Sequence, residues 1–203
     1  MARATADARE SEIARHFQRS RDAFERAFTD REFLSAVAAV AKIIADAYRN
    51  GGKLLIAGNG GSAGDAQHIA AEFLSRYLLD RQPLPAIALT TDTSVLTAVG
   101  NDYGFERVFE RQVRGLGRRG DVFLAISTSG RSANVLAALR AAREIGLVTV
   151  GFTGSGTNEM RGHCDQMLCA PSAETAVVQQ IHIIAAHAIC GVVERELFGG
   201  PGA

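Results

Sequence analysis

Five short apolar runs, separated by stretches of helical periodicity, constrain the fold of this chain more than any other feature. The runs cover residues 54–57, 84–90, 121–127, 147–153 and 166–170. Apolar runs of this length are typical of strands buried on both faces of a sheet, and parallel neighbours need crossover connections, usually helices. The pattern therefore predicts an α/β fold in three αβα layers, built on a five-stranded, doubly wound parallel sheet.

Helical periodicity fills the regions around these runs. Apolar residues recur at three- and four-residue spacing over 7–50, which predicts two helices that divide near Thr29 and Asp30. Further helices are expected from Ser62 and over 105–116, 132–145 and 174–198. We expect a single structural domain, with an N-terminal helical segment over 1–50 that packs on the core or in an oligomer, and the α/β part over 51–198.

Composition restricts the partners and the compartment. The 22 basic residues are balanced by 22 acidic ones, so binding to nucleic acid or a membrane surface through bulk charge is not expected. Three cysteines are too few for a disulfide framework, and an odd count suits a reducing compartment. No apolar window is expected to reach the length of a membrane span, because Gln, His and Glu interrupt the C-terminal one. These observations predict a cytoplasmic protein without nucleic-acid or membrane partners.

A glycine-rich turn, Gly58 to Gly61, joins the first apolar run to the helix expected from Ser62. Such a turn leaves backbone N–H groups free at a helix N-terminus, where an anion such as phosphate is stabilised. The turn also satisfies the G-x-G-x-x-G/A pattern of dinucleotide-binding proteins. That pattern needs an acidic residue at the end of the second strand, whereas Asp92 lies too far along and Asp80 precedes the strand. We therefore expect no nucleotide cofactor.

A second polar cluster follows the third apolar run and contains Ser127, Thr128, Ser129 and Ser132. In open α/β sheets ligands bind beyond the carboxyl ends of the strands, and hydroxyl and N–H groups there can surround a phosphate. The same residue types also favour an ordinary turn with a helix N-cap. A second glycine-rich strand end in the same sheet favours the phosphate interpretation.

His68 and Glu72 stand four residues apart on the helix after the glycine-rich turn, so they share one helix face. Gln179 and His187 share a face of the last helix, two turns apart, while His182 points elsewhere. A solvated ion pair is the usual explanation of an isolated His and Glu. Two imidazoles, a carboxylate and an amide oxygen are also an acceptable ligand set for Zn²⁺ or a related divalent ion. The sequence pattern alone does not decide between the two.

Four segments carry a resemblance to a known family. GNGGSAGDAQHIAAEF, LPAIALTTDTSVLTAVGNDYGFERVFERQV, GDVFLAISTSGRSANVL and QQIHIIAAHAIC together resemble the phosphoheptose isomerases of the SIS (sugar isomerase) fold, a flavodoxin-like, doubly wound architecture. The resemblance covers residues 33–198. It implies conversion of D-sedoheptulose 7-phosphate to D-glycero-D-manno-heptose 7-phosphate through an enediolate, the first step of nucleotide-activated heptose synthesis for lipopolysaccharide or other surface glycans.

The resemblance also implies a homotetramer with active sites between subunits, and one Zn²⁺ per subunit held by His68, Glu72, Gln179 and His187. Glu72 is implied as the base and His187 as the acid. The implied sugar-phosphate contacts are Asn59, Gly60, Gly61, Ser62, Glu72, Arg76, Asn101, Asp102, Ser127, Thr128, Ser129, Ser132 and Gln179. Gln180 departs from the family, which commonly has Glu there.

Three other functions stay open at the level of sequence. One is a dinucleotide-dependent oxidoreductase, which would show a bound cofactor by absorbance in the purified protein. A non-catalytic SIS-fold protein would bind a sugar phosphate or a replication initiator in a regulatory role, and retention of all four implied metal ligands argues against it. An isomerase of the same fold with a sugar of another chain length is the alternative that the sequence discriminates least.

Overall fold

The computed structural model describes residues 2–156 and 159–200. Its helices are α1 (Ala2–Thr29), α2 (Arg31–Arg49), α3 (Gly61–Leu74), α4 (Thr93–Tyr103), α5 (Val108–Leu116), α6 (Ala133–Ile145) and α7 (Thr175–Phe198). Its strands are β1 (Leu54–Gly58), β2 (Ala86–Ala88), β3 (Val122–Ile126), β4 (Val148–Thr153) and β5 (Gln166–Cys169). Two 3₁₀ turns, η1 (Phe105–Arg107) and η2 (Met160–His163), complete the described chain.

The five strands form one parallel sheet in the order β2-β1-β3-β4-β5, which confirms the predicted doubly wound architecture. The chain adds β2 on one side of β1 and then crosses to add β3 on the other side, so the strand order reverses between β1 and β3. Gly58 at the end of β1 is in register with Ile126 at the end of β3. The two polar turns that follow these strands are therefore neighbours at the point where doubly wound sheets bind ligands.

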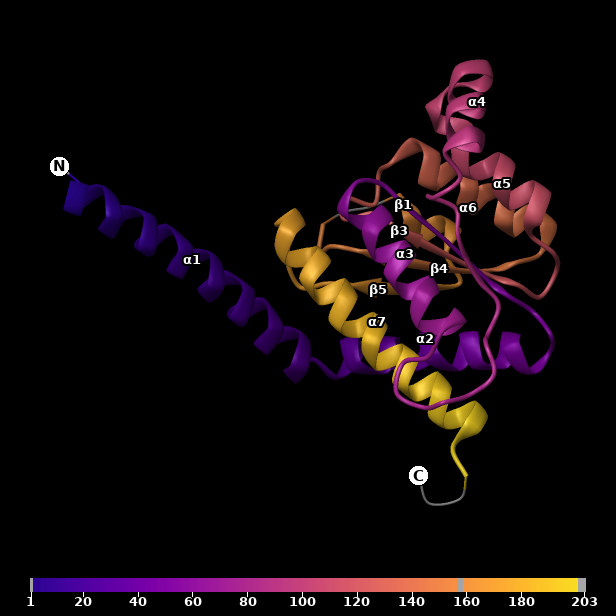
Figure 1. Cartoon of the computed structure of the whole chain (residues 1–203), viewed down its shortest axis with the longest axis horizontal. Coiled ribbons are helices and arrows are strands. Elements are labelled where there is room, and N and C mark those ends of the chain that lie inside the picture. The colour runs from indigo at the N-terminus through magenta and orange to yellow at the C-terminus, as the bar shows by residue number, and fades with distance from the viewer. Residues whose placement is uncertain (1, 157–158, 201–203) are drawn as a thin grey trace.

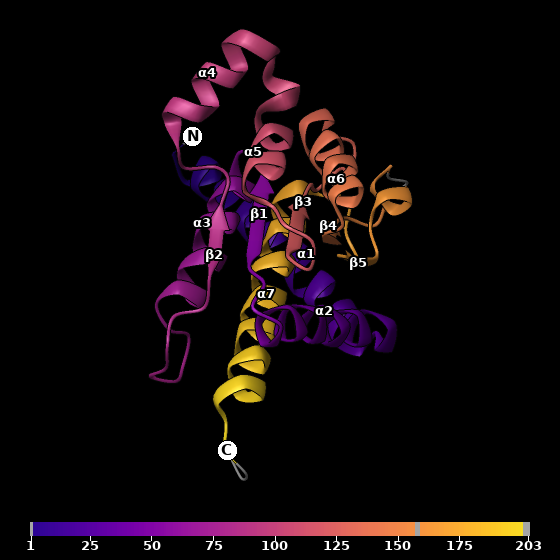
Figure 2. The ribbon, with the colours of Figure 1, turned by 90° about the vertical axis from the view of Figure 1, so that its right-hand side faces the viewer.

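Helices cover both faces of the sheet (Figures 1 and 2). Leu54 and Ile56 face a core formed with α2, α3 and α7. Leu55 and Ala57 face the opposite core, formed with α4, α5 and α6. This alternation is the period of two that a strand imposes, and both sets are buried because both faces of the sheet are covered.

The two N-terminal helices divide where the sequence predicts. The Asp30 carboxylate accepts a hydrogen bond from the Glu32 N–H at 2.8 Å and so caps α2. Helix α1 projects away from the rest of the chain (Figure 1), and its Phe17 and Phe28 side chains are 69% and 63% exposed. These two aromatic side chains therefore lie outside the core of this chain.

The structure differs from the sequence prediction in two elements, a helix that was not predicted and a strand that is shorter than predicted. Helix α4 was not expected, because only Val99 of its residues is buried and the apolar period is weak. The second strand spans three residues instead of the expected 84–90. Pro85 precedes it without an N–H to donate, although its carbonyl accepts from the Leu54 N–H at 3.0 Å. Both elements lie at the β2 edge of the structure.

The expectation that no stretch reaches the length of a membrane span is wrong for α7. Within the described residues, one helix, α7, is long and apolar enough by length and composition, and 56% of its most apolar window is buried inside the protein. It packs on α2 and α3 and carries buried His182 and Glu194. We therefore interpret α7 as a core helix of the layer that also holds α2 and α3.

Candidate active site

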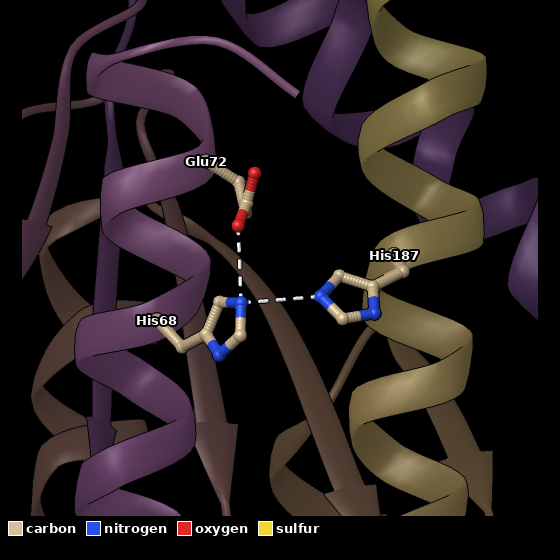
Figure 3. Close-up of side chains that lie close together, drawn as sticks. All are labelled: His68, Glu72 and His187. Atoms are coloured by element: carbon tan, nitrogen blue, oxygen red, sulfur yellow. Dashed lines mark hydrogen bonds and ion pairs between the residues drawn. The ribbon is translucent and has the colours of Figure 1, made fainter. Parts of the chain in front are cut away.

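Helices α3 and α7 run side by side in the same direction and bring distant residues together. At the start of α3, Gly61 lies against Gln179, because a Cβ on this glycine would be 2.5 Å from the Gln179 amide nitrogen. Two turns further along both helices, His187 Nε2 is 3.2 Å from His68 Nε2 (Figure 3). Glu72 Oε1 completes the cluster at 3.0 Å from the same His68 nitrogen.

This cluster of His68, Glu72 and His187 has the chemistry of a divalent metal site. Its three ligand atoms lie within 4.8 Å of one another. Two ligands of a tetrahedral Zn²⁺ with bonds of 2.0–2.1 Å are about 3.3 Å apart, which is close to the observed distances of 3.0 and 3.2 Å. His68 Nε2 carries at most one hydrogen, which cannot be donated to both the Glu72 carboxylate and the His187 nitrogen. A cation between the three atoms satisfies all their lone pairs, so these residues fit a metal.

The other half of α7 places Gln179 and Gln180 differently. Gln179 stands two turns before His187 and makes no hydrogen bond to the three clustered side chains, although it faces the same helix. Gln180 turns toward α1, where its Nε2 lies 3.4 Å from His16 Nε2. Position 180 therefore lies against the N-terminal helix.

The turns after β1 and β3 are joined by polar side chains. Asn59 and Asn134 exchange two hydrogen bonds of 2.9 Å between their amides. Gly60, with φ of 56°, turns the chain into α3, and the Ser62 N–H donates to the Asn59 carbonyl. Asn134 is buried and was missed from the sequence, where it reads as an ordinary first-turn residue of α6. The pair fixes the glycine-rich turn against the serine-rich one.

The serine-rich turn directs hydroxyl groups toward one another at the carboxyl end of β3. Ser127 Oγ and Ser132 Oγ are 3.0 Å apart, and Ser127 is buried. Ser132 occupies the N-cap position of α6, but its side chain makes no capping hydrogen bond. Because that hydroxyl is directed at Ser127, the turn is more than an ordinary capped helix start. Thr128 is half-buried, and Ser129 Oγ accepts from the Arg131 N–H at 3.3 Å.

Three other expected contacts lie apart from these turns within one chain. Asn101 and Asp102 are exposed near the end of α4, where the Asn101 amide donates to the Asp102 carboxylate at 2.8 Å. Helix α4 leads away from the sheet (Figure 1). Arg76 is exposed just beyond α3 and makes no hydrogen bond or ion pair with another described residue. These side chains reach a substrate only if it, or a neighbouring chain, approaches them.

Burial shifts the pKa of three titratable groups on α3 and α7. Burial, together with the neighbouring carboxylates of Glu72 and Glu194, raises the pKa of the Cys190 thiol to about 12. Burial lowers the pKa of His182 to about 4, although its Nε2–H donates to the Thr153 carbonyl at 3.1 Å. Asp65 on α3 has its pKa raised by burial. Because its hydrogen bond is made to Thr153, His182 points away from the cluster, as predicted, and its ring lies in the core.

The sequence reasoning also missed Tyr77, which stacks on the His187 ring with centroids 5.6 Å apart and an interplanar angle of 17°. Nothing in the local pattern marks it, because the residue lies in the loop after α3 and its partner is on α7.

The sheet is doubly wound, with polar turns beyond β1 and β3. The model of the SIS domain family matches residues 16–154, so the chain has a SIS domain. A phosphoheptose isomerase from Bradyrhizobium sp. (strain ORS 278) is 58% identical over 191 residues, covering 94% of this chain and 96% of that relative. A phosphoheptose isomerase from Roseiflexus sp. (strain RS-1) is 59% identical over 162 residues, covering 80% of this chain and 82% of that relative. The structure of the phosphoheptose isomerase from Neisseria gonorrhoeae matches with a TM-score of 0.86 and 42% sequence identity, covering 91% of this chain and 98% of that one.

The chain therefore belongs to the phosphoheptose isomerase family. The protein is an isomerase with a SIS domain, which confirms the resemblance stated from the sequence.

Proposed function

We propose that this protein converts D-sedoheptulose 7-phosphate to D-glycero-D-manno-heptose 7-phosphate in the cytoplasm, as the first step toward nucleotide-activated heptoses for lipopolysaccharide or another surface glycan. The observation that carries the proposal is the meeting of His68, Glu72 and His187 within 4.8 Å, on the helix that begins at the polar turn after β1 and on the last helix. Membership in the phosphoheptose isomerase family supports the same substrate.

The phosphate is held by the serine-rich turn at the N-terminus of α6. Hydroxyl groups and free N–H groups there stabilise an anion, and the helix dipole adds to them. The proposed sugar-phosphate contacts are Asn59, Gly60, Gly61, Ser62, Glu72, Arg76, Asn101, Asp102, Ser127, Thr128, Ser129, Ser132 and Gln179. Binding energy from the phosphate positions the other end of the sugar at the cluster between α3 and α7.

The metal would be one Zn²⁺ per subunit, held by His68, Glu72 and His187 with Gln179 as the fourth ligand. When bound, such an ion supplies Lewis-acid polarisation of the substrate oxygens at C1 and C2. Within one chain the Gln179 side chain lies against Gly61, two helical turns from the other three ligands. Its amide oxygen would therefore have to come from a neighbouring subunit of the proposed oligomer.

The reaction moves a proton between C2 and C1 and therefore needs a base and an acid. Glu72 is the proposed base. Its Oε1 faces His68, whereas Oε2 makes no hydrogen bond within the described chain, so one oxygen serves as a ligand and the other can take the carbon proton. His187 is the proposed acid for the substrate oxygen. Its ring is held by the stacking of Tyr77.

The assembly we propose is a homotetramer with active sites at subunit interfaces. Its support is the apolar surface between α1, α2 and α7, a groove lined by Phe24, Phe28, Phe33, Leu34 and Ile184 among others. Side chains of this size exposed together mark an interaction site in a soluble protein. In this arrangement residues 1–50 form the oligomeric helical segment, and residues 51–198 form the SIS domain.

Turnover measured with and without metal tests this function. Purified protein is incubated with sedoheptulose 7-phosphate, and the aldose product is followed by NMR. Metal-replete protein is expected to form the aldose, and a chelator is expected to stop the reaction because Lewis-acid polarisation is lost. Fructose 6-phosphate serves as the control for a sugar of another chain length. No turnover of the heptulose by metal-replete protein would refute the proposal and favour a non-catalytic sugar-phosphate-binding role.

A further inference from the structure

A buried ion pair links α7 to the loop that follows α3. Arg81 and Glu194 have side chains only 2% and 1% exposed, and Arg81 Nε donates to Glu194 Oε1 at 3.0 Å. The carboxylate also accepts three backbone N–H groups, from Tyr77 at 2.7 Å, Leu78 at 2.8 Å and Leu79 at 3.0 Å. Burial alone would raise the pKa of Glu194, but these N–H donors and the guanidinium hold it below its ordinary value. Glu194 is thus a fully satisfied buried anion that fixes the loop.

The guanidinium of Arg81 binds the other side of the same junction. Its Nη2 donates to the Glu72 carbonyl at 2.8 Å, and its Nη1 donates to the Phe73 carbonyl at 2.5 Å. A helix leaves its last carbonyls without partners, so a cation at this end of α3 satisfies them and is favoured by the helix dipole. Arg81 therefore anchors the backbone of Glu72, one of the three clustered residues.

The loop fixed by Glu194 presents the Tyr77 ring to the third clustered residue. The ring stacks on His187 and also lies against Gly191, one turn further along α7, where a Cβ would be 3.2 Å from the ring. A side chain on that turn would press on the tyrosine. The imidazole of His187 is therefore confined between the tyrosine on one side and the His68 ring, with centroids 5.0 Å apart, on another.

We propose that Arg81, Glu194 and Tyr77 form a positioning unit that holds Glu72 and His187 at metal-binding distance, with Tyr77 setting the orientation of the His187 ring. The proposal rests on the metal centre of the proposed function. A buried ion pair is weak evidence for stability, since apolar replacements of similar volume are often neutral or stabilising. This pair instead fixes the backbone of Glu72 through Arg81, and the loop that carries Tyr77 through Glu194. Outer partners of metal ligands typically change metal affinity or activity by about 10- to 100-fold when removed.

The first test compares two buried carboxylates, one at the site and one remote from it. Asp121 accepts the Lys53 and Arg118 N–H groups and pairs with the Lys53 ammonium at the amino end of β3. Zn²⁺ affinity of the full chain is measured by competition with a chromophoric chelator, and the Tm of metal-free protein is measured alongside. Glu194→Gln is expected to weaken Zn²⁺ binding by about 10- to 100-fold. Asp121→Asn is expected to lower the Tm but leave Zn²⁺ affinity at the wild-type value.

The second test leaves the ion pair in place and changes only the stacking ring. Tyr77→Phe keeps the ring and is expected to bind Zn²⁺ like the wild type. Tyr77→Leu removes it and is expected to bind about tenfold more weakly, with an altered visible spectrum of the Co²⁺-loaded protein. Because Tyr77 is only half-buried, both variants are expected to fold.

Three outcomes would overturn this proposal, and the first two of them leave the proposed function standing. Wild-type Zn²⁺ affinity in both Glu194→Gln and Tyr77→Leu would overturn the positioning role while leaving the isomerase intact. Equal weakening by Asp121→Asn would show a general effect of stability and would also overturn it. Absence of Zn²⁺ binding by the wild-type protein would remove the metal centre and this proposal together.

Discussion

Replacing His182 with Gln is expected to make the protein less sensitive to acid. His182 lies on the buried face of α7, where its Nε2–H donates to the Thr153 carbonyl and its Nδ1 has no hydrogen-bond partner within the described chain. Burial in this apolar environment, against the Phe152 ring, disfavours the charged imidazolium and lowers the pKa to about 4. Gln keeps an N–H donor of similar reach but cannot take up a proton at these pH values.

The magnitude follows from the two pKa values. In the unfolded chain His182 takes up a proton near pH 6.5, whereas in the folded protein it does so only near pH 4. Between these values the unfolded state binds more protons than the folded state, so the free energy of unfolding falls as the pH falls. The gap corresponds to about 3 kcal/mol, fully present above pH 6.5 and lost by about pH 4.

Urea unfolding of metal-free protein at pH 7.0, 5.5 and 4.5 measures this difference. Chelator is present throughout, so that loss of metal from His68 and His187 does not contribute. The native chain is expected to lose more stability than His182→Gln between pH 7.0 and 4.5, by about 2–3 kcal/mol. Carboxylates such as Asp65 titrate in both proteins and cancel in the comparison. Equal losses in the two proteins would refute the assignment of a neutral, buried His182.

Three further changes test the site and the fold. Glu72→Gln is expected to abolish turnover with the Tm within a few degrees of the wild type; NMR activity near normal would contradict its role as base. Gly61→Ala places a Cβ within 2.5–2.8 Å of the Gln179 amide, a flexible group that can move. It is expected to weaken Zn²⁺ or substrate binding with little loss of stability, and unchanged KM and metal affinity would count against the site. Asp30→Ala removes the α2 cap from Glu32 and is expected to cost about 1 kcal/mol in urea unfolding; no measurable loss would contradict the capping assignment.

Local patterns are sufficient for most of the architecture. The five parallel strands follow from apolar runs, because a strand covered on both faces has no polar alternation to obscure it. The division at Asp30 follows from the chemistry of a helix cap. His68 and Glu72 meet because residues four apart share a helix face, so that half of the cluster is local as well.

The remaining features depend on contacts between distant segments. His187 meets His68 across 119 positions of sequence, and this pairing was available only through the family resemblance. Arg81 and Glu194, 113 positions apart, look like ordinary surface charges until α7 packs against the loop after α3. Helix α4 was missed because most of its residues are exposed and leave little apolar period to detect.

The parallel packing of α3 and α7 would also couple binding of the proposed metal to the folding of the whole layer. His68 and Glu72 come from the first helix after the sheet begins, and His187 comes from the last helix, so no metal site exists until α7 has packed. An ion that binds only the packed form stabilises it by mass action, by about 2.7 kcal/mol at a concentration 100 times its Kd. The supply of the proposed metal would then affect the stability of the folded protein as well as its rate of turnover.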